Sequence, residues 1–218
     1  PRENAAFVAC MEDILDLYHL PYDPARPVIT MDEQPYQRLA NTRELLPMRP
    51  GAELREDYEY ERCGTASIFM FSEPLGRWRR TSVRERRTAE DWAEEVRSLL
   101  EKDFPHVEKI VLICDNLNTH SLSSLYKAFP AEKARELAKR LEMHFTPKHG
   151  SWLNVAECEL SALTRQSLQQ RIPTIEKLDE IVTAWTDCRN KTQKTVDWQF
   201  STEDARIKLK SLYPQTQL

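Results

Sequence analysis

Glycine is scarce in this 218-residue chain, which contains only Gly51, Gly64, Gly76 and Gly150. These four positions cannot form a G-x-G-x-x-G dinucleotide loop or a G-x-x-x-x-G-K-[ST] phosphate loop, and no G-x-S-x-G serine motif occurs. The sequence therefore argues against Rossmann-type redox enzymes, P-loop nucleotide hydrolases and the common type of serine hydrolase. No nucleotide cofactor is expected.

Cysteine is also sparse, with an odd count of five and no C-x-x-C pair. The absence of that pair argues against a zinc ribbon or zinc finger. Wide spacing and an odd count are typical of a reducing compartment, so we expect a cytoplasmic protein. Cys114 lies in an apolar run and is expected to serve packing rather than chemistry.

Long hydrophobic runs are missing as well. No stretch of about 18 apolar residues occurs, which excludes an obvious membrane-spanning helix. The N-terminus becomes charged within a few residues and has no signal-peptide pattern. Since the first residue is Pro1 and not Met, we expect the chain to be a fragment or a processed product.

Hydrophobic periodicity predicts alternating strands and helices. The predicted strands cover residues 27–32, 66–71, 78–83, 109–114 and 143–146. Helices are predicted over residues 4–18 and 152–170, with others beginning near Thr88, Pro130, Thr174 and Ser201. Residues 35–56 are polar and show no clear pattern.

This order of elements predicts an α/β protein with a mixed five-stranded sheet, helices on both faces and extra C-terminal helices. It is the order of the ribonuclease H-like fold. We expect an N-terminal helix and linker (1–26), a catalytic domain (27–172) and a C-terminal helical extension packed on that domain (173–218).

Three carboxylates occupy the ends of these elements. Asp32 closes the first predicted strand, Asp115 closes the fourth, and Glu157 lies in the first turns of the helix after the fifth. In this fold the first and fourth strands are neighbours, which would bring the two aspartates together. Hard cations such as Mg²⁺ prefer oxygen ligands, and convergent carboxylates suit two-metal phosphodiester chemistry.

Two other acids compete for these places. Glu159 lies about 200° around the helix from Glu157, so only one of them can face the site. Glu33 points to the opposite face of its strand from Asp32 and is a weaker ligand candidate. The simpler alternative for every acid is a solvated surface carboxylate.

The residues around the three acids resemble a known family. The segments Met31–Gln34, Cys114–His120 and Phe145–Asn154, the last followed by Glu157, are similar to those of DDE transposases, in the insertion-sequence branch of the mariner superfamily. The resemblance covers roughly residues 1–190. It implies that Asp32, Asp115 and Glu157 form a metal-binding catalytic triad.

The same resemblance implies the reaction and its partners. Members of the family cleave DNA at the ends of a mobile element and join those ends to target DNA. This implies two Mg²⁺ ions during catalysis, with Mn²⁺ able to substitute. It also implies double-stranded DNA as partner, a homodimer in the active complex, and a bacterial, nucleoid-associated location.

The chain departs from the family pattern in two ways. Forty-one residues separate Asp115 from Glu157, more than in many mariner-type enzymes, and we expect the extra length in the charged helix 131–140. No room precedes the first strand for the family's N-terminal helix-turn-helix. We therefore expect either a catalytic domain alone or a chain that has lost its DNA-binding part.

Polar residues near the acids are candidates for phosphate, metal-bound water or DNA contacts. These are Asn116, Asn118, His120, Lys148 and His149. The alternatives are a turn whose Asn side chains bond their own backbone, and a solvated loop. Trp152, Trp185 and Trp198 are expected to be buried.

The net charge is −4, which is unusual for a dedicated nucleic-acid-binding module, but six arginines gather between Arg77 and Arg87. Arg79, Arg80 and Arg84 could follow a DNA backbone. The alternative is that alternate arginines only line the solvent face of a hairpin.

Three functions remain open from the sequence. The first is a metal-dependent DNA endonuclease and strand transferase. The second is a transposase-derived DNA-binding protein without catalytic activity. The third is a ribonuclease H or junction resolvase on the same fold, although those enzymes lack the W-L-N-x-x-E segment found at Trp152–Glu157.

Overall fold

A computed structural model describes residues 4–42, 59–192 and 195–214. Within them the chain forms one five-stranded sheet with the order β3-β2-β1-β4-β5. The strands are β1 (Val28–Asn41), β2 (Tyr60–Ser72), β3 (Arg79–Arg84), β4 (Ile110–Cys114) and β5 (Leu141–Phe145). The expected α/β class is confirmed.

The sheet is mixed, as expected. β1 and β3 are antiparallel to β2, whereas β4 is parallel to both β1 and β5. A parallel pair needs a crossover connection, and here helices provide it. This is the ribonuclease H-like arrangement, and it makes β1 and β4 neighbours at the centre of the sheet.

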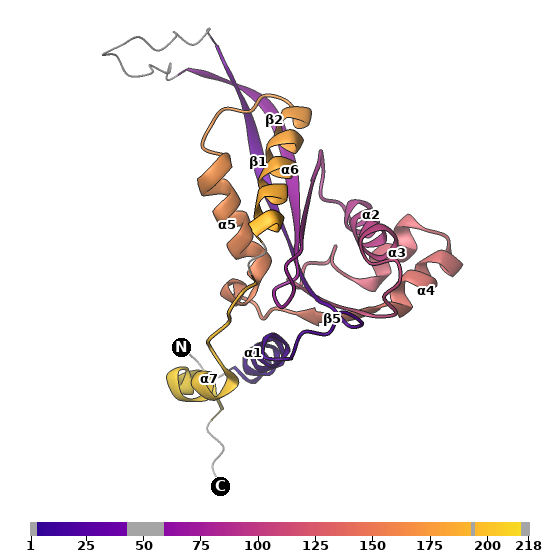
Figure 1. The fold of residues 1–218 in the computed structure, drawn as a ribbon, viewed down its shortest axis with the longest axis vertical. Helices are drawn as coiled ribbons and strands as arrows, with labels where there is room; N and C mark the ends of the chain where they lie inside the picture. The colour runs from indigo at the N-terminus through magenta and orange to yellow at the C-terminus, as the bar shows by residue number, and fades with distance from the viewer. Residues whose placement is uncertain (1–3, 43–58, 193–194, 215–218) are drawn as a thin grey trace.

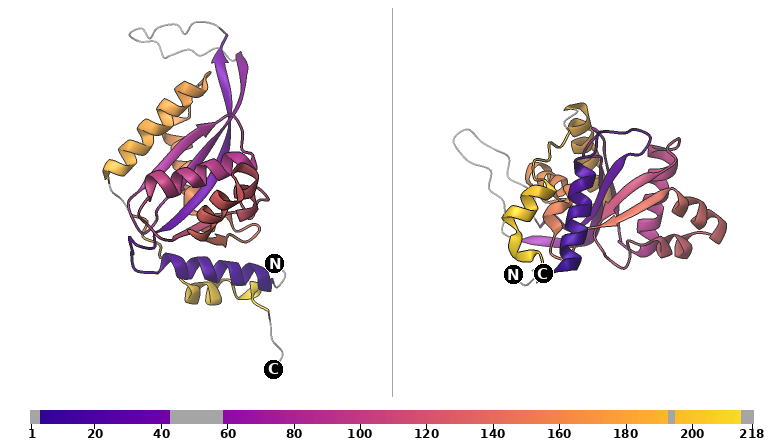
Figure 2. Two further views of the ribbon diagram at one scale, coloured as in Figure 1. Left: turned by 90° about the vertical axis from the view of Figure 1, so that its right-hand side faces the viewer. Right: turned by 90° about the horizontal axis from the view of Figure 1, so that it is seen from below.

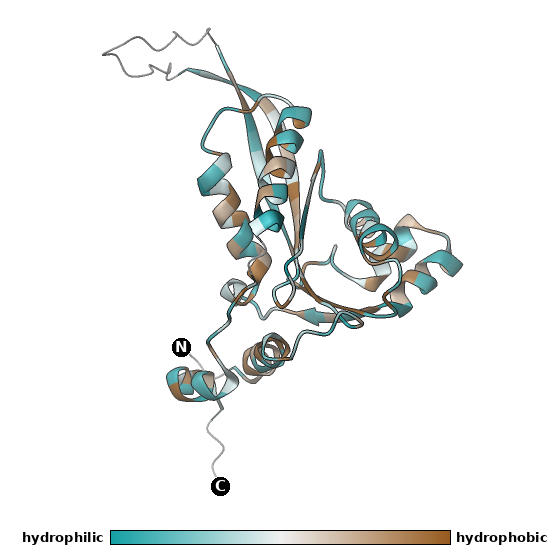
Figure 3. Ribbon diagram, viewed as in Figure 1, coloured by the Kyte–Doolittle hydropathy of each residue, from teal (hydrophilic) through white to brown (hydrophobic). Residues whose placement is uncertain are grey.

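Helices cover both faces of the sheet (Figures 1 and 2). The α-helices are α1 (Ala5–Tyr18), α2 (Ala89–Ser98), α3 (Leu122–Ala128), α4 (Ala131–Lys139), α5 (Val155–Ser167), α6 (Ile175–Thr192) and α7 (Thr202–Lys208). Short π or 3-10 turns cover Leu99–Asp103, Ser151–Leu153 and Lys210–Leu212. Figure 3 shows hydrophilic and hydrophobic residues on the same helices, as expected where one side meets a core.

The two faces of the sheet bury different side chains because strand residues alternate. Ile29 and Met31 point to the face covered by α2, α3 and α4, where they pack with Trp92. Val28 points to the other face and packs with α1 and α7. The same face of β2, through Ile68, packs against α5 and α6.

The helix starts follow their predicted signals in two places. Thr88 with Asp91, and Ser201 with Asp204, each form a capping box that opens α2 and α7. In contrast, no prediction was made for the segment that forms α3. Leu122, Leu125 and Tyr126 recur there at helical spacing, but the pattern is only seven residues long, and packing of Leu125 in the core stabilises the helix.

β1 is longer than predicted, because it continues through Pro35 to Asn41. Proline has no N–H to donate and is therefore confined to strand edges. Beyond Thr30, β1 pairs with β2 only, so its other side is open where Pro35 lies. Polar residues are common in edge strands, so hydrophobic periodicity did not reveal this segment as a strand. Residues 43–56, the rest of that polar stretch, lie largely outside the described residues.

The C-terminal helices contact different parts of the fold. α6 packs on β3 and α5, and α7 packs on α1. Trp185 is buried as expected, whereas Trp198 is only partly buried. Cys114 is buried, which agrees with its expected packing role, and all five cysteines are free thiols. No helix in the described part of the chain is long and apolar enough to cross a membrane.

A buried ion cluster joins three of these elements. Glu159 of α5 lies 3.1 Å from the Arg79 guanidinium of β3 and 2.8 Å from the Arg189 guanidinium of α6. The side chains of Arg79 and Glu159 are only 2% and 5% exposed. Asn190 adds to the cluster, because its amide donates to the Arg79 carbonyl and accepts from the Arg79 N–H.

Removing Glu159 should destabilise the folded protein, because it leaves the arginines of the cluster unpaired. We expect Glu159→Ala to lower the free energy of unfolding by about 3–5 kcal/mol, because it leaves Arg79 buried without a counter-charge. Chemical denaturation measures the change. Glu180→Ala is the matched control, since Glu180 pairs with Lys177 on the exposed face of α6 and should cost less than about 1 kcal/mol. Equal losses in the two variants would contradict the role of the cluster.

Candidate active site

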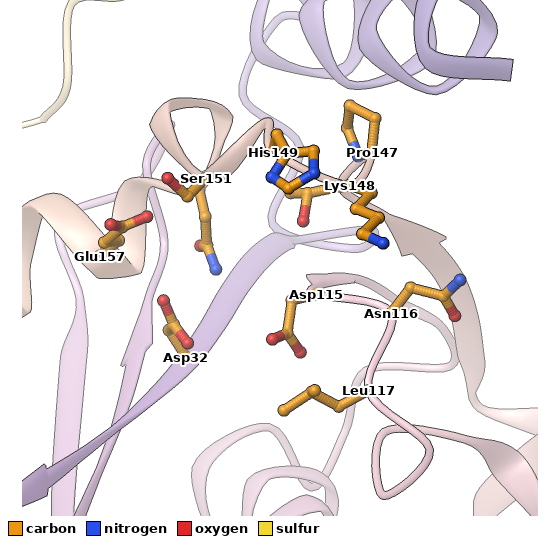
Figure 4. A pocket seen from close by; sticks show the side chains of 11 residues that line it. Asp32, Asp115, Asn116, Leu117, Pro147, Lys148, His149, Ser151 and Glu157 are labelled. Carbon is orange, nitrogen blue, oxygen red and sulfur yellow. The ribbon is translucent and has the colours of Figure 1, made fainter.

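A pocket of about 440 Å³ opens where β4 ends beside β1 (Figure 4). Asp32, Asp115 and Glu157 all line it. Asp32 lies within β1 and not at its end as predicted, because the strand continues to Asn41. In the view of Figure 4, Asp32 lies between the other two carboxylates. The other residues that line the pocket are Asn116, Leu117, Thr146, Pro147, Lys148, His149, Ser151 and Asn154.

Strand register brings the two aspartates together. β1 and β4 pair in parallel, and the last paired residues are Thr30 and Ile113. Asp32 and Asp115 each lie two residues beyond that pair, so the register places them opposite one another. Because side chains alternate along a strand, both aspartates also point to the same face of the sheet.

Asn154 connects the third acid to the first. Its side-chain oxygen accepts a hydrogen bond from the Ala156 N–H at 3.1 Å, which caps the start of α5. Its amide nitrogen donates to the carbonyl of Met31 at 3.0 Å, one residue before Asp32. The first turn of α5, which carries Glu157, is therefore attached directly to the backbone of β1 next to Asp32. The W-L-N-x-x-E segment contains this residue, but its role was missed from the sequence.

The orientation of α5 separates the two competing glutamates. Glu157 is exposed and lines the pocket, whereas Glu159 is buried in the cluster with Arg79 and Arg189. With Glu159 occupied elsewhere, Glu157 is the acid that this helix presents to the site.

The pocket holds an excess of negative charge at Asp32. Burial raises the pKa of Asp32 to about 7, a hydrogen bond from the Glu33 N–H opposes the rise, and the nearby charges of Asp115 and Glu157 add to it. Among the described residues, the charge of His120 also opposes the rise. Such a group is stabilised strongly by a cation that enters the pocket.

His120 does not face the pocket, contrary to its expected role as a phosphate or water contact. It is buried beneath Asp115, with its Nδ1 atom hydrogen-bonded to the Asp115 carboxylate and its Nε2 atom 3.1 Å from Glu33. Burial alone would lower the pKa of His120, but the hydrogen bonds and charges of Asp115 and Glu33 outweigh it and raise the pKa to about 9. Glu33 points away from Asp32, as strand alternation predicted.

The remaining loop candidates divide between two positions. Asn116, Lys148 and His149 line the pocket, and Figure 4 shows Lys148 and His149 across it from the aspartates. Asn118 is exposed and does not line the pocket. His149 has a backbone φ of 66°, a strained value for a side-chain-bearing residue and one that clusters at functional sites.

The three candidate arginines are engaged in the fold. Arg79 lies in the buried cluster with Glu159, and its burial rules out contact with a DNA phosphate in this conformation. Arg80 pairs with Glu95 and Asp103, and Arg84 pairs with Glu95 at 2.6 Å. Neither the expected DNA track nor the alternative of a solvent-facing row describes them, because charge pairing with α2 and α5 draws them onto the protein.

Trp152 is not the core anchor expected from the sequence. It is 40% exposed, stacks on Trp198 with ring centroids 6.4 Å apart, and meets the edge of Phe200. Leu153, the next residue, is fully buried instead, and its carbonyl accepts a hydrogen bond from Tyr18 of α1. The apolar position in this motif was assigned one residue too early.

Comparison with known families identifies the family of this chain. The family described as DDE superfamily endonuclease matches residues 27–179. The chain belongs to this superfamily. The match begins at β1, includes all three acids and ends within α6.

Solved transposase structures share the fold of this DDE endonuclease. The Mos1 mariner paired end complex with Mn has a TM-score of 0.56 at 16% identity, over 86% of this chain and 57% of the other. The Mos1 Strand Transfer Complex has a TM-score of 0.56 at 14% identity, over 83% and 53%. The chain thus spans little more than half the length of these relatives. No curated protein matches the sequence.

The donor set of the pocket suits a hard divalent cation. All three acids supply oxygen, the ligand type that Mg²⁺ and Mn²⁺ prefer. Among the described residues, no three His, Cys, Asp or Glu side chains surround a single point closely enough to hold one ion together. Asp32 is central, so the arrangement fits two sites that share Asp32, one with Asp115 and one with Glu157. Mg²⁺ commonly uses one or two carboxylates and completes its shell with water and phosphate.

The raised pKa of Asp32 predicts a pH effect on stability in metal-free buffer. Because the folded chain holds the Asp32 proton more tightly than the unfolded chain does, the associated stability is present in acid and is lost as pH rises from about 4 to about 7. Asp32→Asn removes this dependence. Between about pH 5 and about pH 8, we expect the wild type to lose about 2–3 kcal/mol more than the variant.

Denaturation of both proteins in a chelating buffer measures this difference. Glu73 also has a pKa raised to about 7 by burial, but it is present in both proteins and its contribution cancels. Parallel pH profiles for the two proteins would contradict the charge imbalance at Asp32.

Proposed function

We propose that this DDE endonuclease is the catalytic region of a transposase, which uses divalent metal ions to cleave DNA at the ends of a mobile element and to join those ends to target DNA. The observation that carries the proposal is the convergence of Asp32, Asp115 and Glu157 on one pocket of a DDE-family fold. The related Mos1 structures support it, because they include paired end complexes with Mn and with Mg and a Strand Transfer Complex.

Each acid has a defined part in this reaction. Asp32 and Asp115 would hold one ion and Asp32 and Glu157 the other, with Asp32 between them. Bound metal would supply activation of the attacking oxygen and stabilisation of the leaving 3′ oxygen. The chain itself orients the carboxylates through strand register and the Asn154 cap, and it buries Asp32 beside the other two acids.

The far side of the pocket provides groups for DNA. Lys148, His149 and Asn116 are exposed and lie at its rim, so a phosphate bound through metal ions at the acids would lie between them and the sheet. Double-stranded DNA is the proposed partner, and a homodimer is the proposed active form, because two element ends must be held together. Arg79, Arg80 and Arg84 are left out of this surface.

The function is tested by nicking. The full 218-residue chain is incubated with supercoiled plasmid carrying the ends of the element, with Mg²⁺, with Mn²⁺ or with chelator. We expect nicking to depend on the metal. Asp115→Asn should reduce it by more than about 100-fold, because loss of a residue that only supports a metal ligand already costs about 10–100-fold. Asp187→Asn, an exposed carboxylate on α6, is the matched control and should nick like the wild type.

Other substrates separate the alternatives. Equal nicking by the wild type and Asp115→Asn would refute the proposed chemistry. Metal-independent DNA binding without nicking would instead identify a DNA-binding descendant. Preferential cleavage of an RNA–DNA hybrid or a four-way junction would identify a ribonuclease H or a resolvase.

Lys148 should contribute one phosphate contact. We expect Lys148→Ala to weaken duplex binding and to lower the slope of log affinity against log salt by about 1. Lys133→Ala is the matched control. Lys133 lies on α4 and is paired with Glu101 and Glu136, and no residue of α4 lines the pocket. Fluorescence anisotropy over a salt series measures both slopes. An unchanged slope for Lys148→Ala would remove this residue from the DNA surface.

A further inference from the structure

A chain of contacting side chains runs from the pocket beneath Asp115, and its two middle members, His120 and Glu33, are buried. His120 is fully buried at its side chain and contacts two carboxylates, one through each ring nitrogen. The first is Asp115, at the pocket wall, and the second is Glu33, whose side chain is 4% exposed. Arg87 closes the chain, with its guanidinium 3.6 Å from Glu33.

The His120 ring has little freedom to turn. It stacks on Trp92, with ring centroids 6.0 Å apart and planes 29° from parallel, and Trp92 is itself fully buried. Its backbone N–H donates to the carbonyl of Leu117 at 2.9 Å. A ring fixed by stacking, by its backbone and by two carboxylates holds the Asp115 side chain in one orientation.

Both ring nitrogens face carboxylates, which only accept hydrogen bonds when ionised. The arrangement is therefore complete when the ring carries a proton on each nitrogen. Its charge then lies between Asp115 and Glu33, and Arg87 offsets the second acid. The cluster needs no metal to be satisfied, and it leaves the outer oxygen of Asp115 free for the pocket.

We infer that His120 and Glu33 are positioning residues that fix the Asp115 carboxylate and thereby set the affinity of the pocket for a divalent cation. This inference rests on the proposed function. Outer-shell partners of this kind orient ligands, and their loss costs about 10–100-fold in metal affinity. β1 thus supplies a ligand to the pocket at Asp32 and, at the next residue, support for the ligand on β4.

The test uses Mn²⁺ alone as the probe, with its dissociation constant measured by titration calorimetry on the full chain. We expect His120→Ala to weaken Mn²⁺ binding by about 10–100-fold. His120→Asn keeps a donor near the Nδ1 position and should recover part of that loss. Glu33→Gln, which removes the charge behind the ring, should weaken binding by less than His120→Ala does.

His144→Asn is the matched control. His144 also contacts two carboxylates, Asp13 at 2.6 Å and Glu142 at 3.2 Å, but it lies on β5 and does not line the pocket. The Mn²⁺ affinity of the His144→Asn variant should equal that of the wild type. Thermal unfolding in chelator verifies that each variant is folded, and if His120→Ala is not, His120→Asn and Glu33→Gln carry the comparison.

Nicking at low and saturating Mn²⁺ gives a second measurement. A positioning role predicts that activity lost at low Mn²⁺ returns at saturation, which a general loss of folded protein would not show. Mn²⁺ affinities within twofold of the wild type for all His120 and Glu33 variants would overturn the inference and leave the proposed function intact. If the wild type bound no more Mn²⁺ than Asp115→Asn, the proposed function would fail instead.

Discussion

The parallel pairing of β1 with β4 is the constraint on which the site depends. Only three residue pairs define it, from Val28 with Val111 to Thr30 with Ile113. Continued by two residues, the same register sets Asp32 opposite Asp115 and points both to one face of the sheet. The carboxylates repel one another, and burial penalises Asp32 further, so the rest of the fold must hold them together against that repulsion.

α5 is held at two points for this purpose. Asn154 attaches its first turn to the backbone of β1, and Glu159 locks its rotation through Arg79 and Arg189. Glu157 lies between these anchors and is free of both. The two glutamates of this helix therefore have opposite tasks: one stabilises the position of the helix, and the other uses that position to face the pocket.

Sequence reasoning predicted the fold well because strands and capping boxes carry local signals. The five strands, the capping boxes at Thr88 and Ser201 and the adjacency of Asp32 to Asp115 could all be predicted, although Asp32 lies inside β1 and not at its end. It did not predict long-range pairing. The run of arginines suggested a DNA-binding surface. Arg79 pairs instead with Glu159, which lies 80 positions away in the sequence, and local patterns do not indicate such a contact. His120 was misplaced for the same reason, since its partner Glu33 lies on another strand.

The adjacency of Asp32 and Glu33 has a consequence for the length of β1. One residue faces the pocket and the next supports it from behind, because successive strand residues face opposite ways. A single-residue insertion or deletion between Thr30 and Asp32 would exchange these two faces and place the ligand where the support belongs. This short stretch of chain should therefore tolerate substitution far better than any change in length.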